Sequence, residues 1–91
     1  MAYRTRIEIT SKILEIAVGG ALKTRIMYGA YLSFPQTREY LDFLQEKGLL
    51  EYHKDNKQYW TTEKGKTFLT EIIEMQQLLA PSNKSALMLA E

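Results

Sequence analysis

The apolar residues of the chain change their spacing twice, and these changes divide the sequence into three parts. Up to Lys47 they recur at intervals of three and four residues, the period of helices with one buried face. From Leu49 to Thr61 they form short, aromatic-rich alternating runs, which are typical of strands. The helical period then returns and continues to Leu79. The pattern therefore predicts helices, a two-stranded ribbon and a final helix.

The first part is predicted to contain three helices, of which the first two are separated by glycines. The first helix is expected over about residues 5–18, and Gly19-Gly20 ends it. The second is expected from residue 22 or 23 to about residue 31, with Gly29 near its end.

The third helix has clear start and stop signals. Ser33 can cap the first turn, Gln36 stands at the matching capping-box position, and Pro35 lacks only an N–H that needs no partner there. Gly48 follows, where a left-handed residue often terminates a helix. The helix is therefore expected over about residues 34–47.

The ribbon and the last helix complete the order of elements. Two strands, 49–53 and 58–61, flank Lys54-Asp-Asn-Lys57, whose Asp and Asn suit a tight turn. The last helix is expected over about 63–79, because Pro81 disfavours helix at the residue before it. Helices followed by a two-stranded wing predict an α+β, mostly α fold, the winged helix-turn-helix.

Composition excludes several kinds of chemistry. The 91 residues include no cysteine and one histidine, so neither a disulfide framework nor a thiolate zinc site is expected. His53 has no partner pattern for nucleophilic or acid–base catalysis, and the glycines form no phosphate-binding loop. We predict a non-enzyme with no cofactor and no metal. No apolar run approaches the ~20 residues that cross a bilayer, so we expect a cytoplasmic protein without a membrane partner.

Charge is distributed unevenly although the net charge is only +1. Residues 1–66 hold 11 of the 12 lysines and arginines but only 8 of the 11 acidic residues. Helix starts and the wing tip carry the side chains that we predict to bind DNA, because such positions offer donors to phosphates and base edges. These residues are Lys23, Arg25, Ser33, Gln36, Thr37, Arg38, Lys54, Asn56 and Lys57. Arg4 and Arg6 could add an arm.

Three acidic residues, Glu39, Asp42 and Glu46, follow on the same helix and would repel phosphates. Either that helix enters the groove by its N-terminal end only, or the fold serves as a protein–protein interaction module. A third hypothesis is single-strand binding on exposed aromatic side chains, although core packing explains most of these rings better. Tyr40 and Trp60 are the two aromatic residues expected to be partly exposed.

Two segments, 23–33 and 57–65, resemble small archaeal winged-helix DNA-binding proteins of the chromatin or transcription-regulator type. The resemblance implies a homodimer made by antiparallel coiling of the last helices. In this sequence the matching stripe is Phe68, Ile72, Met75 and Leu79. Two departures from the family pattern are Pro81, which limits the helix, and Thr61, which stands where an apolar residue is usual. We therefore expect a short contact, with residues 86–89 folding back over it.

Together these observations predict three segments. Residues 5–62 form the winged helix-turn-helix domain, 63–80 the C-terminal dimerisation helix, and 81–91 a tail that is either a short docked helix or disordered. The function expected is that of a homodimeric, nucleoid-associated protein or transcription regulator that binds double-stranded DNA. Its helix at about 34–47 would lie in the major groove, with the wing on the backbone.

Overall fold

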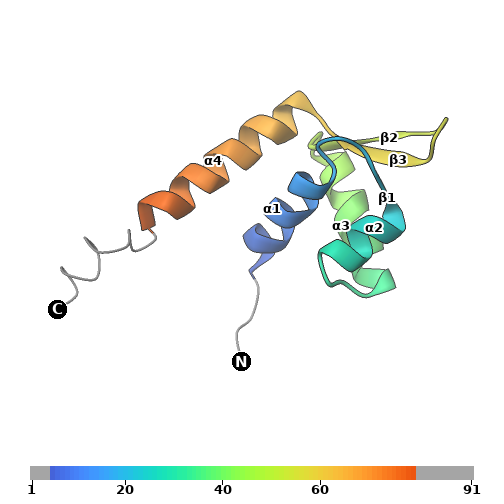
Figure 1. Ribbon diagram of the computed structural model, residues 1–91, viewed down its shortest axis with the longest axis horizontal. Helices are drawn as coiled ribbons and strands as arrows, with labels where there is room; N and C mark the ends of the chain where they lie inside the picture. Colours follow the sequence, from blue (N-terminus) through green and yellow to red (C-terminus); the bar gives the residue numbers. More distant parts are fainter. Residues whose placement is uncertain (1–4, 80–91) are drawn as a thin grey trace.

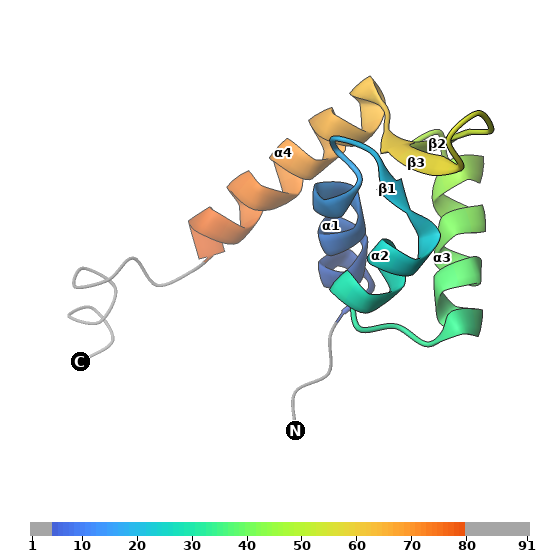
Figure 2. The same ribbon diagram turned by 45° about the vertical axis from the view of Figure 1, so that its right-hand side comes forward.

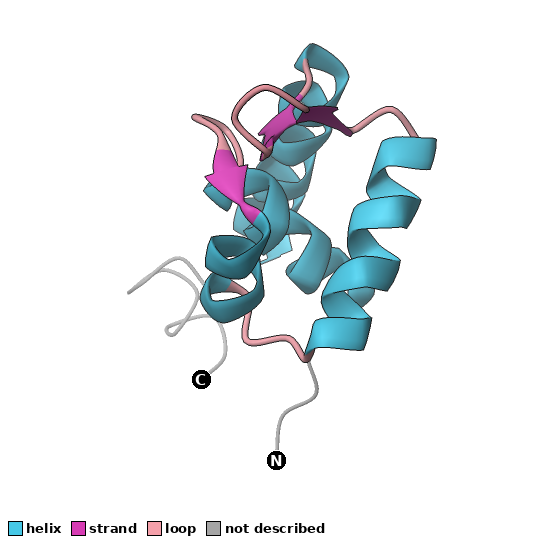
Figure 3. Cartoon of the chain, turned by 90° about the vertical axis from the view of Figure 1, so that its right-hand side faces the viewer, coloured by secondary structure: helices cyan, strands magenta, loops and turns pink. Residues whose placement is uncertain are grey.

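The structure, a computed structural model of the chain, describes residues 5–79. Within this range four helices and three short strands follow one another, and the strands lie at one side of a mostly helical body (Figures 1 and 3). In chain order they are α1 (Arg6–Ile16), β1 (Ala21–Leu22), α2 (Lys23–Gly29), α3 (Phe34–Glu46), β2 (Leu50–His53), β3 (Gln58–Thr61) and α4 (Glu63–Leu79). The predicted fold and element order are confirmed, and each predicted boundary lies within about two residues of the observed one.

The sheet contains one strand that the sequence pattern did not predict. Its order is β1-β3-β2 with both pairs antiparallel, and Leu22 of β1 stands opposite Gln58 of β3. From the sequence, Leu22 is expected at or just before the start of the second helix and Ala21 in no element, because two residues are too few to show an alternating pattern. Gly20 at φ +89° leads into β1, and a Cβ there would lie 2.6 Å from the Trp60 ring. The short strand covers one edge of β3 and so ties the wing to the helices.

The core lies where the helices converge beneath the sheet (Figure 2). α1 packs against α2, α4 and β3. Its Ile13 and Leu14 are fully buried with Ile26 of α2 and Leu44 of α3. Burying a side chain of this size stabilises the folded state by roughly 1.5–3 kcal/mol. Because α1 buries two of them and packs against three other elements, it is the central element of the core.

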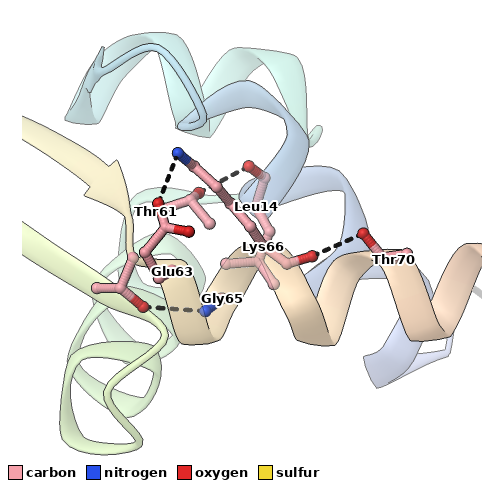
Figure 4. A network of polar contacts seen from close by, with 7 residues as sticks. Leu14, Thr61, Glu63, Gly65, Lys66 and Thr70 are labelled. Carbon is pink, nitrogen blue, oxygen red and sulfur yellow. Dashed lines mark hydrogen bonds and ion pairs between the residues drawn. The ribbon is translucent and has the colours of Figure 1, made fainter.

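Thr61 connects the sheet to the end of α1. Its Oγ1 donates to the carbonyl oxygen of Leu14 at 2.7 Å (Figure 4). Its N–H donates to the carbonyl oxygen of Ala17 at 3.0 Å. The N–H of Val18 turns to Glu15, so the Leu14 carbonyl has lost its usual partner four residues on. A threonine at this position, where the resemblance expects an apolar residue, therefore satisfies a buried helix-end carbonyl.

α4 starts at the end of the sheet and crosses α1. Thr62 Oγ1 accepts from the N–H of Gly65 at 2.9 Å and donates to the carbonyl oxygen of Gly48 at 2.7 Å, which fixes the first turn. A Cβ on Gly65 would overlap the carbonyl oxygen of Leu49. The glycine therefore allows α4 to lie directly against the chain that enters β2. The second half of α4 extends away from the domain (Figures 1 and 2).

Replacing Gly65 by alanine tests this close approach. We expect Gly65→Ala to lower the free energy of unfolding by about 1–3 kcal/mol, because the backbone of α4 must move away from Leu49. Urea denaturation followed by circular dichroism measures it. Gly19→Ala is the control, since a Cβ there would meet no atom within 4 Å. Equal stability of the two variants would contradict the proposed role of Gly65.

The Thr61 hydroxyl can be tested by a substitution that keeps the shape of the side chain. Thr61→Val should cost about 1–3 kcal/mol of unfolding free energy, since it leaves the buried Leu14 carbonyl unsatisfied. Thr61→Ser retains the hydroxyl and should recover most of the lost hydrogen bond. Thermal and urea unfolding of both variants check the difference, and a fully stable Thr61→Val would show that the bond contributes little.

Candidate nucleic-acid interface

The first turn of α3 is held by the predicted capping box. Ser33 Oγ accepts from the N–H of Gln36 at 3.2 Å, and Gln36 Oε1 accepts from the N–H of Ser33 at 2.9 Å. The side-chain NH₂ group of Gln36 stays available as a donor. Bidentate reading of adenine uses both the carbonyl oxygen and the NH₂ group of a glutamine, and the cap already occupies one of the two lone pairs of Gln36 Oε1.

Thr37, a predicted DNA contact, points into the protein. It is 0% exposed, and its Oγ1 donates to the carbonyl oxygen of Ser33 at 2.8 Å. The residue lies about one helical turn before Leu41 and two turns before Leu44 on the buried face of α3. It therefore cannot reach a nucleic acid while the helix keeps this packing, and the sequence-based assignment of Thr37 to the interface does not hold.

Arg38 is exposed on α3, and Arg25 is exposed on α2. Lys23, at the start of α2, places its ammonium 4.1 Å from the centroid of the Phe34 ring, the first residue of α3. This cation–π contact joins the starts of the two helices.

The wing tip carries the other predicted contacts. Lys54, Asn56 and Lys57 are all exposed, and Asn56 Oδ1 accepts from the N–H of Gln58 at 3.2 Å to close the turn. Lys57 adopts φ +57°, a left-handed conformation that non-glycine residues visit mainly in turns. Behind the tip, the rings of Tyr52 and Tyr59 pack with centroids 4.8 Å apart.

A hollow of about 420 Å³ separates the wing from the start of α2, and two predicted DNA contacts line it. Lys23 comes from the α2 side and Lys57 from the wing side. The pairing of Leu22 with Gln58 in the sheet brings them together, although they are far apart in sequence. The unpredicted strand β1 thus places a cation of the helical part beside a cation of the wing.

The acidic residues of α3 are all exposed. Glu39, Asp42 and Glu46 recur at i, i+3 and i+7, opposite the buried face of the helix. Burial raises the pKa of Tyr59, and the nearby charges of Tyr52 and Asp42 raise that pKa further. Asp42 is therefore close enough to the wing to influence it. The outer face of α3 carries negative charge along its middle and end, with Arg38 near its start.

The exposure of several aromatic rings differs from the expectation. Tyr28, Tyr31 and Phe34, which surround the turn between α2 and α3, are 72%, 81% and 56% exposed. Tyr40 and Trp60 are both half-buried and so partly exposed, as expected, with Tyr40 packed against the core. The buried Trp60 indole nitrogen has no hydrogen-bond partner within residues 5–79. Because the turn is short, rings at both its ends face outward, which periodicity did not reveal.

The predicted dimerisation stripe on α4 is divided between two environments. Ile72 is only 2% exposed within the single chain, on the same face as Leu69, so it is not available to a second chain. Phe68, Met75 and Leu79 keep exposed surface. Leu78 was not predicted for the stripe and is 84% exposed.

Arg6, proposed for an N-terminal arm, is the first residue of α1 and lies over the rings of Tyr40 and Phe43. Arg4 and the tail 81–91 lie outside the described residues. Among residues 5–79, no cluster of three or more histidine or acidic side chains could hold a metal ion. No helix in this range is long and apolar enough to span a membrane.

Comparison with known proteins identifies the family of this chain. A family model described as winged helix-turn-helix matches residues 3–80. The chain belongs to this family. An uncharacterized protein of Methanocaldococcus jannaschii is 32% identical over 77 residues, which cover 84% of this chain and 77% of that relative.

Two solved structures are similar to this winged helix-turn-helix protein. The crystal structure of Sso10a-2, a DNA-binding protein from Sulfolobus solfataricus, has a TM-score of 0.75 and 34% sequence identity, with 82% of this chain and 81% of that chain covered. The transcriptional repressor CouR bound to p-coumaroyl-CoA has a TM-score of 0.62 at 24% identity, covering 97% of this chain and 72% of that one. The second likeness shows the fold alone. The family and the archaeal relatives confirm the sequence-based resemblance and agree with a non-enzymatic protein.

Proposed function

We propose that this protein binds double-stranded DNA as a homodimer and acts as a transcription regulator or nucleoid-associated protein in the cytoplasm. The observation that carries the proposal is the hollow shared by Lys23 and Lys57, beside the capped start of α3. Cations from two elements facing one hollow can hold one phosphate backbone and release its counterions. The similarity to Sso10a-2, described as a DNA-binding protein, supports the same function.

In this proposal α3 enters the major groove by its N-terminal end. Glu39, Asp42 and Glu46 would repel phosphates, so the later turns stay outside the groove. Arg38 is the natural reader of guanine O6 and N7, and the NH₂ group of Gln36 donates to a base acceptor or to a phosphate.

Phosphate contacts would position the domain. Lys23 and Arg25 hold the backbone on one side of α3, and the wing residues Lys54, Asn56 and Lys57 hold it on the other. Ser33 lies at the start of α3, where the helix dipole favours an anion. The DNA-binding unit in this proposal is residues 5–62, with residues 63–80 serving dimerisation.

The dimer would form through the second half of α4. Met75, Leu78 and Leu79 are 51%, 84% and 86% exposed on a segment that leaves the domain. Phe68, Met75 and Leu79 recur at i, i+7 and i+11, so they share one face next to the buried Ile72. Two copies of this face, related by a twofold axis, would cover each other's apolar surface.

A protein–protein interaction module is the second candidate, and a specific observation favours it. The exposed carboxylates of α3 and the exposed rings of Tyr28, Tyr31 and Phe34 form a mixed apolar and acidic surface. Such a surface suits a basic or apolar partner protein better than it suits phosphates.

Salt dependence and charge reversal test DNA binding. Affinity for a duplex should fall with salt at a log–log slope of about −0.9 per phosphate neutralised. Arg38→Glu combined with Lys57→Glu should weaken binding at least about tenfold and reduce the slope by roughly one per lost contact. Fluorescence anisotropy at several salt concentrations measures both quantities.

The matched control is Lys12→Glu combined with Lys66→Glu, which changes the net charge equally on exposed positions of α1 and α4. This variant should bind nearly as well as the wild type. Binding that ignores salt, or that survives the Arg38 and Lys57 reversals, would sink the DNA proposal and leave the protein-interaction candidate.

Substitutions on the exposed side of α4 test the dimer. Met75→Glu combined with Leu79→Glu should yield monomers in sedimentation, because charges on both apolar positions cannot be buried in a contact. Thr67→Glu combined with Gln77→Glu adds the same charge to exposed polar positions and should leave the mass unchanged. A wild type that is monomeric at every concentration, or a Met75 and Leu79 variant of unchanged mass, contradicts the proposed interface.

A further inference from the structure

A second hollow lies away from the wing, where α1, the end of α3 and the start of α4 meet. Its volume is about 390 Å³, within the range of small-molecule sites, and most of its wall is apolar. The apolar side chains are Ile7, Phe43, Leu44, Leu49 and Phe68. Ile7, Phe43 and Phe68 each keep more than a third of their surface exposed, so an apolar ligand would remove them from water.

Three cations surround this apolar wall: Arg6 from α1, Lys47 from the C-cap of α3 and Lys64 from α4. The Arg6 guanidinium carbon lies 5.8 Å from the centroid of the Phe43 ring, and Lys47 Nζ lies 5.6 Å from the same centroid. Lys64 Nζ donates to the carbonyl oxygen of Lys47 at 2.9 Å. The lining includes no aspartate or glutamate, and none of the three cations forms an ion pair within residues 5–79.

We propose that this groove binds a small organic anion with a flat apolar body, such as an aromatic carboxylate. The body would pack between Phe43 and Phe68, and the carboxylate would accept from Arg6 and Lys47 at the rim. Guanidinium–carboxylate pairing is geometrically specific, and it strengthens where an apolar wall excludes water. None of the residues in this site belongs to the proposed DNA-binding set, and Phe68 is the one residue that it shares with the proposed dimer face.

Charge distinguishes this ligand from a second copy of the chain. The exposed end of α4, Met75-Gln-Gln-Leu-Leu79, carries no charge. Docked in the groove, it would match the apolar wall but leave the three cations without a counterion. An organic anion satisfies both features.

The groove also lies between two helices that the proposed function uses. It contacts the last turn of α3 through Phe43, the C-cap of α3 through Lys47, and the first turns of α4 through Lys64 and Phe68. A ligand there binds to the helix that carries the DNA-reading residues and to the helix that leaves the domain. Binding itself does not depend on the proposed DNA function, so each can fail separately.

The test uses 2-naphthoate as the probe and 2-naphthalenemethanol, which has the same ring system and no charge, as its matched partner. Two-dimensional amide NMR of the full chain follows each titration. We expect 2-naphthoate to shift the amides of residues 6–10, 43–49 and 64–68 saturably, and the neutral alcohol to bind at least about tenfold more weakly.

Charge-removing variants then test whether Arg6 and Lys47 bind the carboxylate. Arg6→Gln combined with Lys47→Gln should weaken 2-naphthoate binding at least about tenfold, leaving Lys64 to cap the end of α3. Lys12→Gln combined with Lys66→Gln removes the same charge outside the groove and should leave binding unchanged. The amide spectrum away from the groove checks that both variants keep the fold.

Three results would overturn the proposal. Equal binding of the acid and the alcohol would mean a merely apolar patch, and equal loss in both charge variants would mean binding to overall positive charge. Groove amides that shift with protein concentration alone, and that stop shifting in the Met75→Glu and Leu79→Glu variant, would assign the groove to a second copy.

Discussion

The hydrogen bonds that Thr61 makes to the end of α1 are the constraint on which the rest of the structure depends. β3 ends at this residue, and its hydroxyl and N–H satisfy the carbonyls of Leu14 and Ala17. Because β3 also pairs with β1 and β2, the same contact fixes the wing relative to the helical core. α4 begins two residues later, so the direction in which it leaves the domain is set from the same point.

This arrangement gives the two ends of α3 different surroundings. Its start lies beside Lys23 and is capped by Ser33, so that end combines donors, a favourable dipole and neighbouring cations. Glu39, Asp42 and Glu46 make the outer face of its later turns acidic. The last turn contributes Phe43 and Lys47 to the apolar groove on another side of the domain. The start of α3 thus forms part of a surface suited to anions, and its end forms part of the separate apolar groove.

The elements with strong local signals could be predicted from the sequence. Ser33, Pro35 and Gln36 identify the start of α3, and apolar spacing identifies α4, because caps and periodicity act over a few neighbouring residues. β1 could not be predicted, since its two residues form a strand only through pairing with β3. Thr37 and Ile72 were assigned to surfaces because residue type and position suggested them. Their burial depends on how wide the core-facing side of each helix is, and only the packed structure determines that width.

In the candidate site, too, local features could be predicted from the sequence and features that depend on packing could not. Residues at helix starts and in the turn were predicted as exposed because of their type and position, and Arg38, Lys54 and Lys57 are exposed. The proximity of Lys23 to Lys57 was not predictable, because it arises from sheet pairing across a long sequence separation. The exposed rings around the turn were also missed, since an aromatic side chain is usually buried and the sequence does not reveal the exceptions.

The capping box of α3 links helix stability to recognition through one side chain. The carbonyl oxygen of Gln36 accepts from the N–H of Ser33, and its NH₂ group forms no bond within this capping box. A base that offers both a donor and an acceptor must either share Oε1 with the N–H of Ser33 or displace it, and loss of a cap interaction costs about 1 kcal/mol. Guanine O6 and N7 and the phosphate oxygens only accept hydrogen bonds, so binding to them leaves the cap bond of Gln36 intact. In the proposed DNA complex, the first turn of α3 would therefore favour groups that accept from the Gln36 NH₂ group over adenine, because adenine would compete with the cap for Oε1.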